Sequence, residues 1–273
     1  MAIITVSRQL ASLGDEVSEK IAEKLGYKFF GKKELEKRIV SLGFPAAKLS
    51  KFDERKLGFL AGLTSLRDEY LNHLMTAILE AASENNCVIV GRGAFILLKN
   101  IENHISCRFI ADEKLRRERL QTSLSCTPKS AAKKITEGEI QQKAFHKSFF
   151  NFDINDPAMF DIIVNTASLD VDSIASSIAA LAKSYVTEQK EKIGMKKIEE
   201  LLIGQRIVNL LVFVYNLDIK FLHTSVDERK ITLHGIAEAK SVADKAFTIV
   251  SAELPGFEIR SAISVSRDFK AYS

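Results

Sequence analysis

Short apolar runs alternate with longer amphipathic stretches over the first two thirds of the chain. The amphipathic stretches carry apolar residues at helical spacing, most clearly from Glu16 to Leu25 and from Leu66 to Ser83. Strands that are separated by helices predict a parallel sheet covered by helices, which is an α/β fold. The runs with the length and composition of buried strands are Ile3–Val6, Cys87–Val90, Ile105–Ile110 and Phe160–Val164.

The pattern changes after a last helical stretch that contains Ile174, Ile178 and Leu181. The charged segment that follows has no apolar periodicity, and it predicts a boundary between a first domain, 1–187, and a second, 195–273. Residues 188–194 are the predicted linker. The second domain reads as a small α+β unit. Its predicted elements are a mixed apolar stretch to about 215, strands at 218–226, 230–234 and 257–265, and a helix around 242–250.

Composition excludes several classes of protein. The chain has 273 residues, 46% of them apolar and 27% charged, and its net charge of +4 gives no reason to expect a nucleic-acid partner. The three cysteines form no C-x-x-C pair and suit neither a disulfide framework nor a zinc site. Neither a secretory signal pattern nor a long apolar run is visible, so a cytoplasmic protein without a transmembrane segment is expected.

The turn after the first strand is the place where such a sheet binds phosphate, because the next helix presents its positive end there. The turn reads Arg8-Gln9-Leu10-Ala11-Ser12-Leu13-Gly14-Asp15-Glu16. It does not match the P-loop pattern G-x-x-x-x-G-K-[ST], and it lacks the lysine that contacts phosphates in that motif. The motif alone favours an ordinary turn between a strand and a helix.

Several segments taken together resemble the cytidylate-kinase-like family of P-loop proteins over roughly residues 1–185. They are the first strand with its turn, the Gly91-Arg92-Gly93 turn, the arginine-bearing segment 111–119 and the last strand, 160–166. The resemblance implies a P-loop kinase fold, with ATP and Mg²⁺ as ligands. No catalytic residue or metal ligand is assigned. The residues that it implies bind nucleotide or phosphate are Arg8, Ser12, Gly14, Arg92, Arg116 and Arg119, although a surface ion pair is the commoner role of an arginine.

The family's loop reads approximately S-R-x-x-G-S-G-G, so the missing lysine is a feature of the family. The departures of this chain lie beside it. Ala11 and Leu13 stand where the family has glycines, and Leu13 is expected to crowd a phosphate and to resist a positive φ. Asp15 and Glu16 would repel an anion. They are also typical of a helix start, with Ser12 as a candidate cap.

Other positions also carry less positive charge than the family pattern. Gln142 or Lys143 occupies the place of an arginine in the family's lid, and Gly31 occupies that of an aspartate. The lysine-rich stretch Pro128–Phe150 falls where such kinases have a mobile lid, and a solvated helical hairpin is the alternative. His104, His146 and His223 have no placed partner and are expected to be incidental.

The second domain resembles a BON domain, through its order of helix, strand, strand, helix, strand and through Gly235 after the second of its strands. That resemblance implies an interaction module that contacts a protein partner or a second copy of the chain.

Three functions remain open from the sequence. The loop chemistry favours a degenerate kinase-like protein that binds a nucleotide for regulation or scaffolding, with weak or no phosphoryl transfer. The overall resemblance favours an active cytidylate-type nucleoside-monophosphate kinase that uses ATP and magnesium. A structural protein that only oligomerises would bind no nucleotide.

Overall fold

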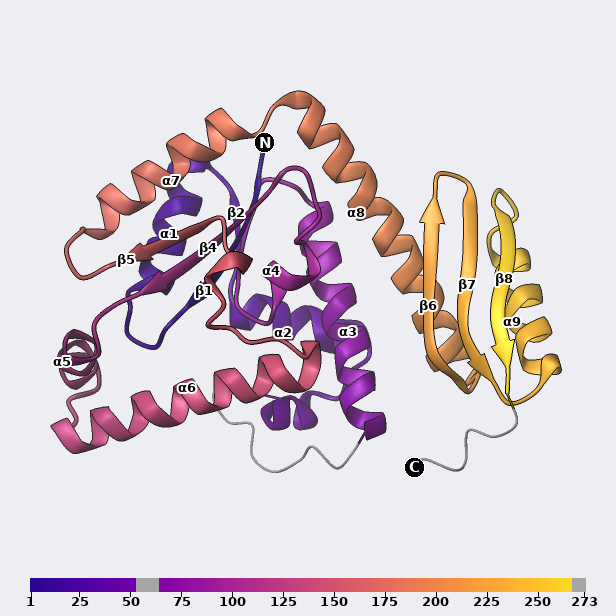
Figure 1. Ribbon diagram of the computed structural model, residues 1–273, viewed down its shortest axis with the longest axis horizontal. Coiled ribbons are helices and arrows are strands. Elements are labelled where there is room, and N and C mark those ends of the chain that lie inside the picture. Colours follow the sequence, from indigo (N-terminus) through magenta and orange to yellow (C-terminus); the bar gives the residue numbers. More distant parts are fainter. Residues whose placement is uncertain (53–63, 267–273) are drawn as a thin grey trace. The chain divides into compact units, whose positions relative to one another are not determined.

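The computed structural model describes residues 1–52 and 64–266, which form two compact units divided between Met195 and Lys196. The first unit is built on a five-stranded sheet in the order β2-β3-β1-β4-β5, with every neighbouring pair parallel (Figure 1). Helices flank this sheet, which confirms the predicted α/β class. The strands are β1 (Ile3–Arg8), β2 (Lys28–Phe30), β3 (Cys87–Val90), β4 (His104–Ile110) and β5 (Ile162–Asn165).

The central strand β1 is buried because it lies between β3 and β4 with helices on both faces. Ile4 and Val6 pack in one apolar cluster with Val17 and Ile21 of the first helix and Ile178 of a later one. All four strands predicted from apolar runs are present, whereas β2 was not predicted. The helices of this unit are α1 (Gly14–Leu25), α2 (Lys32–Ser41), α3 (Thr64–Ser83), α4 (Ala94–Leu97), α5 (Glu113–Leu124), α6 (Pro128–Phe150) and α7 (Val171–Tyr185), with 3₁₀ turns at Ala46–Phe52 and Pro157–Met159.

The lysine-rich stretch 128–150 is one continuous helix, α6, so the alternative of a hairpin within it is wrong. The helix begins sharply because the Thr127 side chain accepts from the Ser130 N–H and Pro128 occupies the first turn. Its apolar face carries Ala131, Ile135, Phe145 and Phe149, all buried. Figure 1 shows α6 running along the edge of the first unit next to α5 and the end of α3.

A buried polar pair joins the two central strands. His104 Nε2 lies 2.7 Å from Thr5 Oγ1, and burial lowers the pKa of His104 to about 4, against a weaker raising effect of the Asp161 carboxylate. The folded protein therefore binds this proton less readily than the unfolded chain, whose histidine has a pKa of 6.5. The contribution of His104 to the free energy of unfolding is fully present above its unfolded pKa of 6.5, and it is lost as the pH falls toward its folded pKa of about 4.

We expect the free energy of unfolding to fall by about 2 kcal/mol between pH 6.5 and about pH 5 through His104 alone. Urea unfolding at several pH values measures it. In a His104→Gln variant this part of the pH dependence should disappear, since the carboxylates that titrate at lower pH are common to both proteins. If the free energy of unfolding changed equally with pH in the variant and in the unsubstituted protein, the prediction would be contradicted.

The second unit pairs a three-stranded sheet with helices. Strand β7 lies between the other two, antiparallel to β6 and parallel to β8. Its core includes Leu211, Leu233, Ala246 and Val250, which are buried. The elements are the end of α8 (Glu188–Asn209), a π-helical turn at Leu210–Val214, β6 (Ile219–Asp227), β7 (Lys230–Ala237), α9 (Lys240–Glu253) and β8 (Glu258–Val265).

The predicted linker, 188–194, forms the first turns of α8, so the backbone is continuous helix where the two units divide. The charged residues of this segment lie on an exposed helical surface, which explains why its sequence lacks an apolar period. Within residues 1–52 and 64–266, no helix has both the length and the apolar character needed to cross a bilayer.

Candidate functional site

The turn between β1 and α1 has a backbone conformation that normally requires glycine. Ala11 has a φ of 61° and Leu13 a φ of 58°, both in the left-handed region, and Leu13 directly precedes α1. The expectation that a leucine would resist a positive φ here is therefore wrong. Contacts around the turn, described below, impose this conformation on Ala11 and Leu13 at a cost of about 1–2 kcal/mol per residue.

Ser12 points into the protein. Its hydroxyl lies 2.9 Å from the Gln9 carbonyl oxygen and 3.1 Å from that of Phe109, and the residue is fully buried. The prediction that Ser12 caps α1 is wrong, because Leu13 occupies the cap position without a capping side chain. The Ser12 side chain holds the turn against β4. Any contact of this residue with phosphate would therefore come from its backbone.

Gly14 and Arg8 fill the place next to the turn. A Cβ at Gly14 would lie 2.4 Å from Arg8 Cβ, so the arginine stem passes directly over the glycine. Arg8 Nε then donates to Asp15 Oδ1 at 2.9 Å, and its carbonyl accepts from Gln142 Nε2 of α6 at 3.2 Å. Asp15 thus serves both as a helix-start acid and as an internal anion for Arg8. The side chain of Asp15 remains half exposed.

Arg119 binds the turn itself. Its guanidinium donates to the Thr166 carbonyl at 2.7 Å, to Thr166 Oγ1 at 3.1 Å and to the Ala11 carbonyl at 3.4 Å. The Thr166 hydroxyl in turn donates to the Ser12 carbonyl at 2.7 Å. Arg119 therefore supports the shape of the loop and has already used much of its donor capacity.

Arg92, in the turn after β3, is held by protein groups. Its Nη2 donates to Glu36 Oε1 at 2.7 Å and its Nη1 to the Phe52 carbonyl at 2.6 Å, and the side chain is almost fully buried. A buried guanidinium with a carboxylate and a carbonyl as partners is largely neutralised. Arg92 fastens α2 and the segment before residue 53 to the sheet.

Arg116 and Arg108 bring positive charge to the end of β4. Arg116 is 4% exposed; its Nε donates to the Ala111 carbonyl and its Nη2 pairs with Glu139 Oε1 at 2.8 Å. Its Nη1 is buried and has no hydrogen-bond partner in the part of the chain that the structure describes. Arg108, which the sequence analysis missed, is also buried, and its Nη1 donates to Ser7 Oγ at 2.9 Å. Its signal was an arginine inside an apolar strand run, because such a residue needs a polar partner.

Helix α6 covers this region with apolar groups, with the Gln142 amide and with the Glu139 carboxylate that pairs with Arg116. Leu10 and Ala11 pack with Ile135 and Leu120, and Gln142, one of the two residues predicted to take the place of the family's lid arginine, donates to the Arg8 carbonyl. The lysines that suggested a charged lid all point to solvent: Lys129, Lys133, Lys134, Lys143 and Lys147. The positive charge of the site therefore comes from β1, β4 and α5.

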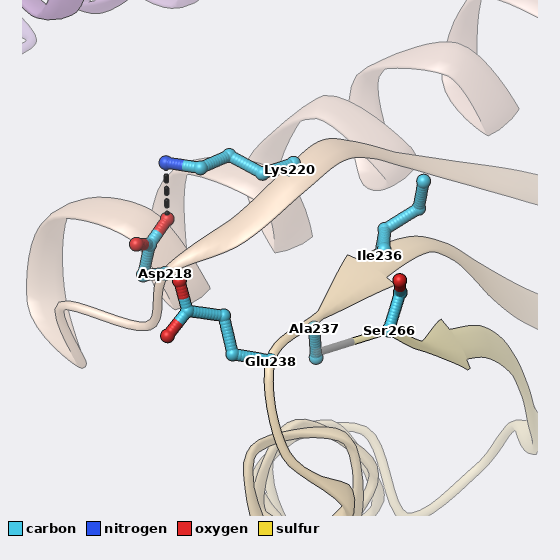
Figure 2. Close-up of a pocket in the computed structure, with 6 residues that line it drawn as sticks. All are labelled: Asp218, Lys220, Ile236, Ala237, Glu238 and Ser266. Atoms are coloured by element: carbon cyan, nitrogen blue, oxygen red, sulfur yellow. Dashed lines mark ion pairs between the residues drawn. The ribbon is translucent and has the colours of Figure 1, made fainter. Parts of the chain in front are cut away.

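A metal centre and a pocket of the second unit are the other two kinds of site that could offer ligand chemistry. The described part of the chain contains no group of three or more His, Cys, Asp or Glu residues arranged to hold a metal ion. A pocket of the second unit is lined by six residues, and its Lys220 pairs with Asp218 at 2.8 Å (Figure 2). Since this cation is neutralised internally, the pocket offers less to an anionic ligand than the β1 turn does. Its other lining residues are Ile236, Ala237, Glu238 and Ser266.

A central parallel strand is followed by a turn with left-handed backbone and by the start of a helix, and arginines from β1, β4 and α5 surround the turn. These features define a P-loop kinase fold. Comparison with known proteins agrees. Residues 3–168 match the cytidylate kinase-like family. The chain belongs to this family.

Relatives named cytidylate kinase align with the same part of the chain. That of Pyrococcus horikoshii is 28% identical over 178 residues, which cover 65% of this chain and 86% of the relative. That of Saccharolobus islandicus is 26% identical, covering 72% and 99%. That of Methanocaldococcus jannaschii is 30% identical over 37% of this chain, which spans 58% of the relative's length. A crystal structure of an uncharacterized protein from Eubacterium ventriosum shares the fold, with a TM-score of 0.53 and 22% identity, covering 67% of this chain and 98% of the other.

Proposed function

We propose that the first unit is a nucleoside-monophosphate kinase that binds ATP at the β1–α1 turn and transfers its terminal phosphoryl group to a nucleoside monophosphate. CMP is the first acceptor to test, because the distant relatives of this unit are named cytidylate kinase. The sequence of the loop had favoured a degenerate kinase-like protein, with the active kinase as the alternative.

The strained turn is the observation that carries the proposal. Ala11 and Leu13 hold left-handed conformations, and no glycine relieves the strain at either position. Strain of this kind persists where the surroundings over-determine the backbone, and it clusters at ligand-binding sites. The Arg119–Thr166 bonds and the buried Ser12 hydroxyl are those surroundings. Such contacts support a loop whose amides are kept in place for phosphate.

Magnesium fits this proposal as an ion that is bound mainly by the phosphates of the nucleotide. Mg²⁺ in kinase sites is bound through one or two carboxylates together with substrate phosphates and water, and it needs no protein cage. Asp15, at the start of α1, is the carboxylate placed to take part. When bound, Mg²⁺ would screen the negative charge of the phosphates, while Arg8, Arg116 and the α1 N-terminus supply positive potential from the protein.

A second candidate, a nucleotide-binding regulator without appreciable transfer, is favoured by the pairing of the site arginines. Arg8 is paired with Asp15, Arg92 with Glu36 and Arg116 with Glu139. Charge committed to internal carboxylates is less available to a transferring phosphoryl group.

Calorimetric titration with ATP and with CMP, each with magnesium, followed by a phosphoryl-transfer assay separates the two candidates. We expect heat for both nucleotides and formation of CDP at a rate that depends on enzyme concentration. Binding without CDP, UDP, ADP or GDP formation from the four corresponding monophosphates would replace the kinase by the regulator. If no nucleotide bound, both the kinase and the regulator would be excluded, and a structural protein that only oligomerises would be the remaining candidate.

For the second unit, we propose the interaction role that its resemblance to a BON domain implies. Large apolar side chains exposed on this unit support the proposal: Phe221 is 73% exposed, Val214 65% and Val265 48%. Sedimentation of the full chain at increasing concentration tests self-association. A monomer at all concentrations would restrict the proposal to a different protein partner.

A further inference from the structure

Among the described residues of the first unit, one buried arginine has no carboxylate at ion-pair distance. Arg92, Arg108 and Arg116 are the arginines of the described residues that are more than nine-tenths buried. Arg92 and Arg116 each pair with a carboxylate, at 2.7 and 2.8 Å. Arg108 has no carboxylate at ion-pair distance within residues 1–52 and 64–266, and its hydrogen bond there runs from Nη1 to the neutral Ser7 hydroxyl.

The surroundings of Arg108 compensate its charge only in part. The guanidinium lies over the Phe160 ring at 5.3 Å, and Glu139 and Asp153 act on it from a distance. Burial lowers the pKa of Arg108 more than these two carboxylates raise it, so the environment disfavours the cation. A buried guanidinium under these conditions is destabilising unless an anion completes its set of partners. The fork geometry of arginine suits a phosphate in that role.

A second unsatisfied donor lies close to the same end of β4. Arg116 Nη1 is buried and has no hydrogen-bond partner among the described residues, while the rest of that guanidinium binds the Ala111 carbonyl and Glu139. Glu139 is the carboxylate that acts on both arginines. Two buried cations that share one partly exposed carboxylate leave an excess of positive charge beside the β1 turn.

The position of Arg108 indicates which phosphate it would meet. Ile4 and Val6 point toward α1, the helix whose N-terminus follows the loop. Ser7 and Arg108 are paired in register on adjacent strands, and their side chains share the opposite face of the sheet. An anion at Arg108 therefore lies across the sheet end from the helix that would hold the donor's phosphates.

We propose that Arg108 binds the phosphate of the acceptor nucleoside monophosphate, assisted by Arg116, a role for which Arg92 is blocked by its pairing with Glu36. The inference rests on the proposed function of the first unit. In this proposal Arg108 recognises the acceptor, whereas Arg119 holds the shape of the loop.

The test compares Arg108→Met with a control, Arg117→Met, in the full-length chain. Arg117 lies on α5 like Arg116, but it is exposed and pairs with Glu113 within the helix. Calorimetry with CMP, UMP, AMP, GMP and ATP gives the affinities, and thermal unfolding without ligand gives stability. We expect Arg108→Met to weaken binding of the preferred monophosphate about 10- to 100-fold and to leave ATP within about twofold. Arg117→Met should change neither.

Stability separates a binding role from a structural one. Methionine retains the length of the side chain without its uncompensated charge, so the unfolding midpoint of Arg108→Met should stay equal or rise. Arg108→Lys, which keeps the charge without the fork, should bind the monophosphate with intermediate affinity. A lower midpoint with unchanged monophosphate affinity would show that Arg108 is structural and overturn the proposal.

The outcomes also separate this inference from the proposed function. Monophosphate binding that depends on Arg108, in a protein that forms no diphosphate, would support the inference and refute the kinase. If Arg108→Met still transferred the phosphoryl group with an unchanged KM for the acceptor, the kinase would be supported and the role of Arg108 would be refuted. A loss of ATP affinity in place of monophosphate affinity, or no nucleotide binding by the unsubstituted chain, would overturn the inference.

Discussion

Gly93→Ala is expected to lower the free energy of unfolding by about 2–4 kcal/mol, through backbone strain and a steric clash together. Gly93 has a φ of +72°, and a Cβ there would lie 2.3 Å from Cε2 and 2.6 Å from Cζ of Phe150. The Phe150 ring neighbours Phe145 and His146, so it can move only by disturbing the end of α6. Urea unfolding measures the loss.

Gly26→Ala is the matched control for Gly93→Ala. Gly26 has a similar φ of +65°, yet a Cβ there meets no atom within 4 Å. Its substitution should therefore show the cost of the left-handed backbone alone, about 1 kcal/mol. In a Phe150→Ala background, the added cost of Gly93→Ala should shrink toward the control value. If both glycine substitutions cost the same in the unsubstituted protein, the contact between the β3 turn and α6 does not matter for stability.

Asp15→Asn is expected to raise the affinity for ATP titrated without magnesium about 5- to 10-fold at low ionic strength, because without the metal Asp15 only repels the phosphates. The substitution removes a carboxylate from the first turn of α1 and releases Arg8 from its ion pair, while the shape of the side chain is kept. A charge interaction of about 1 kcal/mol at this partly exposed position gives that ratio. Calorimetric titration measures it, and the gain should shrink as salt is added.

Glu16→Gln removes the same charge one residue later from the exposed surface of the same turn. Since no ion pair between Glu16 and Arg8 exists among the described residues, this control should raise ATP affinity by less than about twofold. Equal gains in the two variants would attribute the effect to net charge. An unchanged affinity of Asp15→Asn for magnesium-free ATP would contradict the prediction and remove the Arg8–Asp15 ion pair from the explanation.

The sequence predicted the parts of the fold that repeat a pattern. Strand β3 was predicted with its observed bounds, and Tyr70, Leu74 and Ile78, at helical spacing on α3, are fully buried. Strand β2 was missed because three residues, one of them Lys28, are too few to show a period. The lysine-rich stretch 128–150 was singled out from the sequence but was not predicted as one helix, and its contacts with the loop depend on long-range packing that no local pattern contains.

For the candidate site, the sequence indicated which segments lie near the β1–α1 turn, but it did not predict which groups each side chain contacts. Arg116 and Arg119 lie beside the loop, whereas the same reasoning could not foresee that Glu36 holds Arg92. The expectation about the φ of Leu13 was wrong because it considered the residue alone. Tertiary contacts outweigh a local preference of about 1–2 kcal/mol, and here they hold Ala11 and Leu13 in the left-handed region.

The buried face of α6 has a consequence for kinetics. The helix that lies against the loop also supplies Ala131, Ile135, Phe145 and Phe149 to the interior. Moving it away exposes that apolar surface, so displacement of α6 carries the free-energy cost of a local unfolding step. If the proposed nucleotide site is loaded only while α6 is displaced, the observed association rate reaches a plateau, equal to the opening rate, as nucleotide concentration increases.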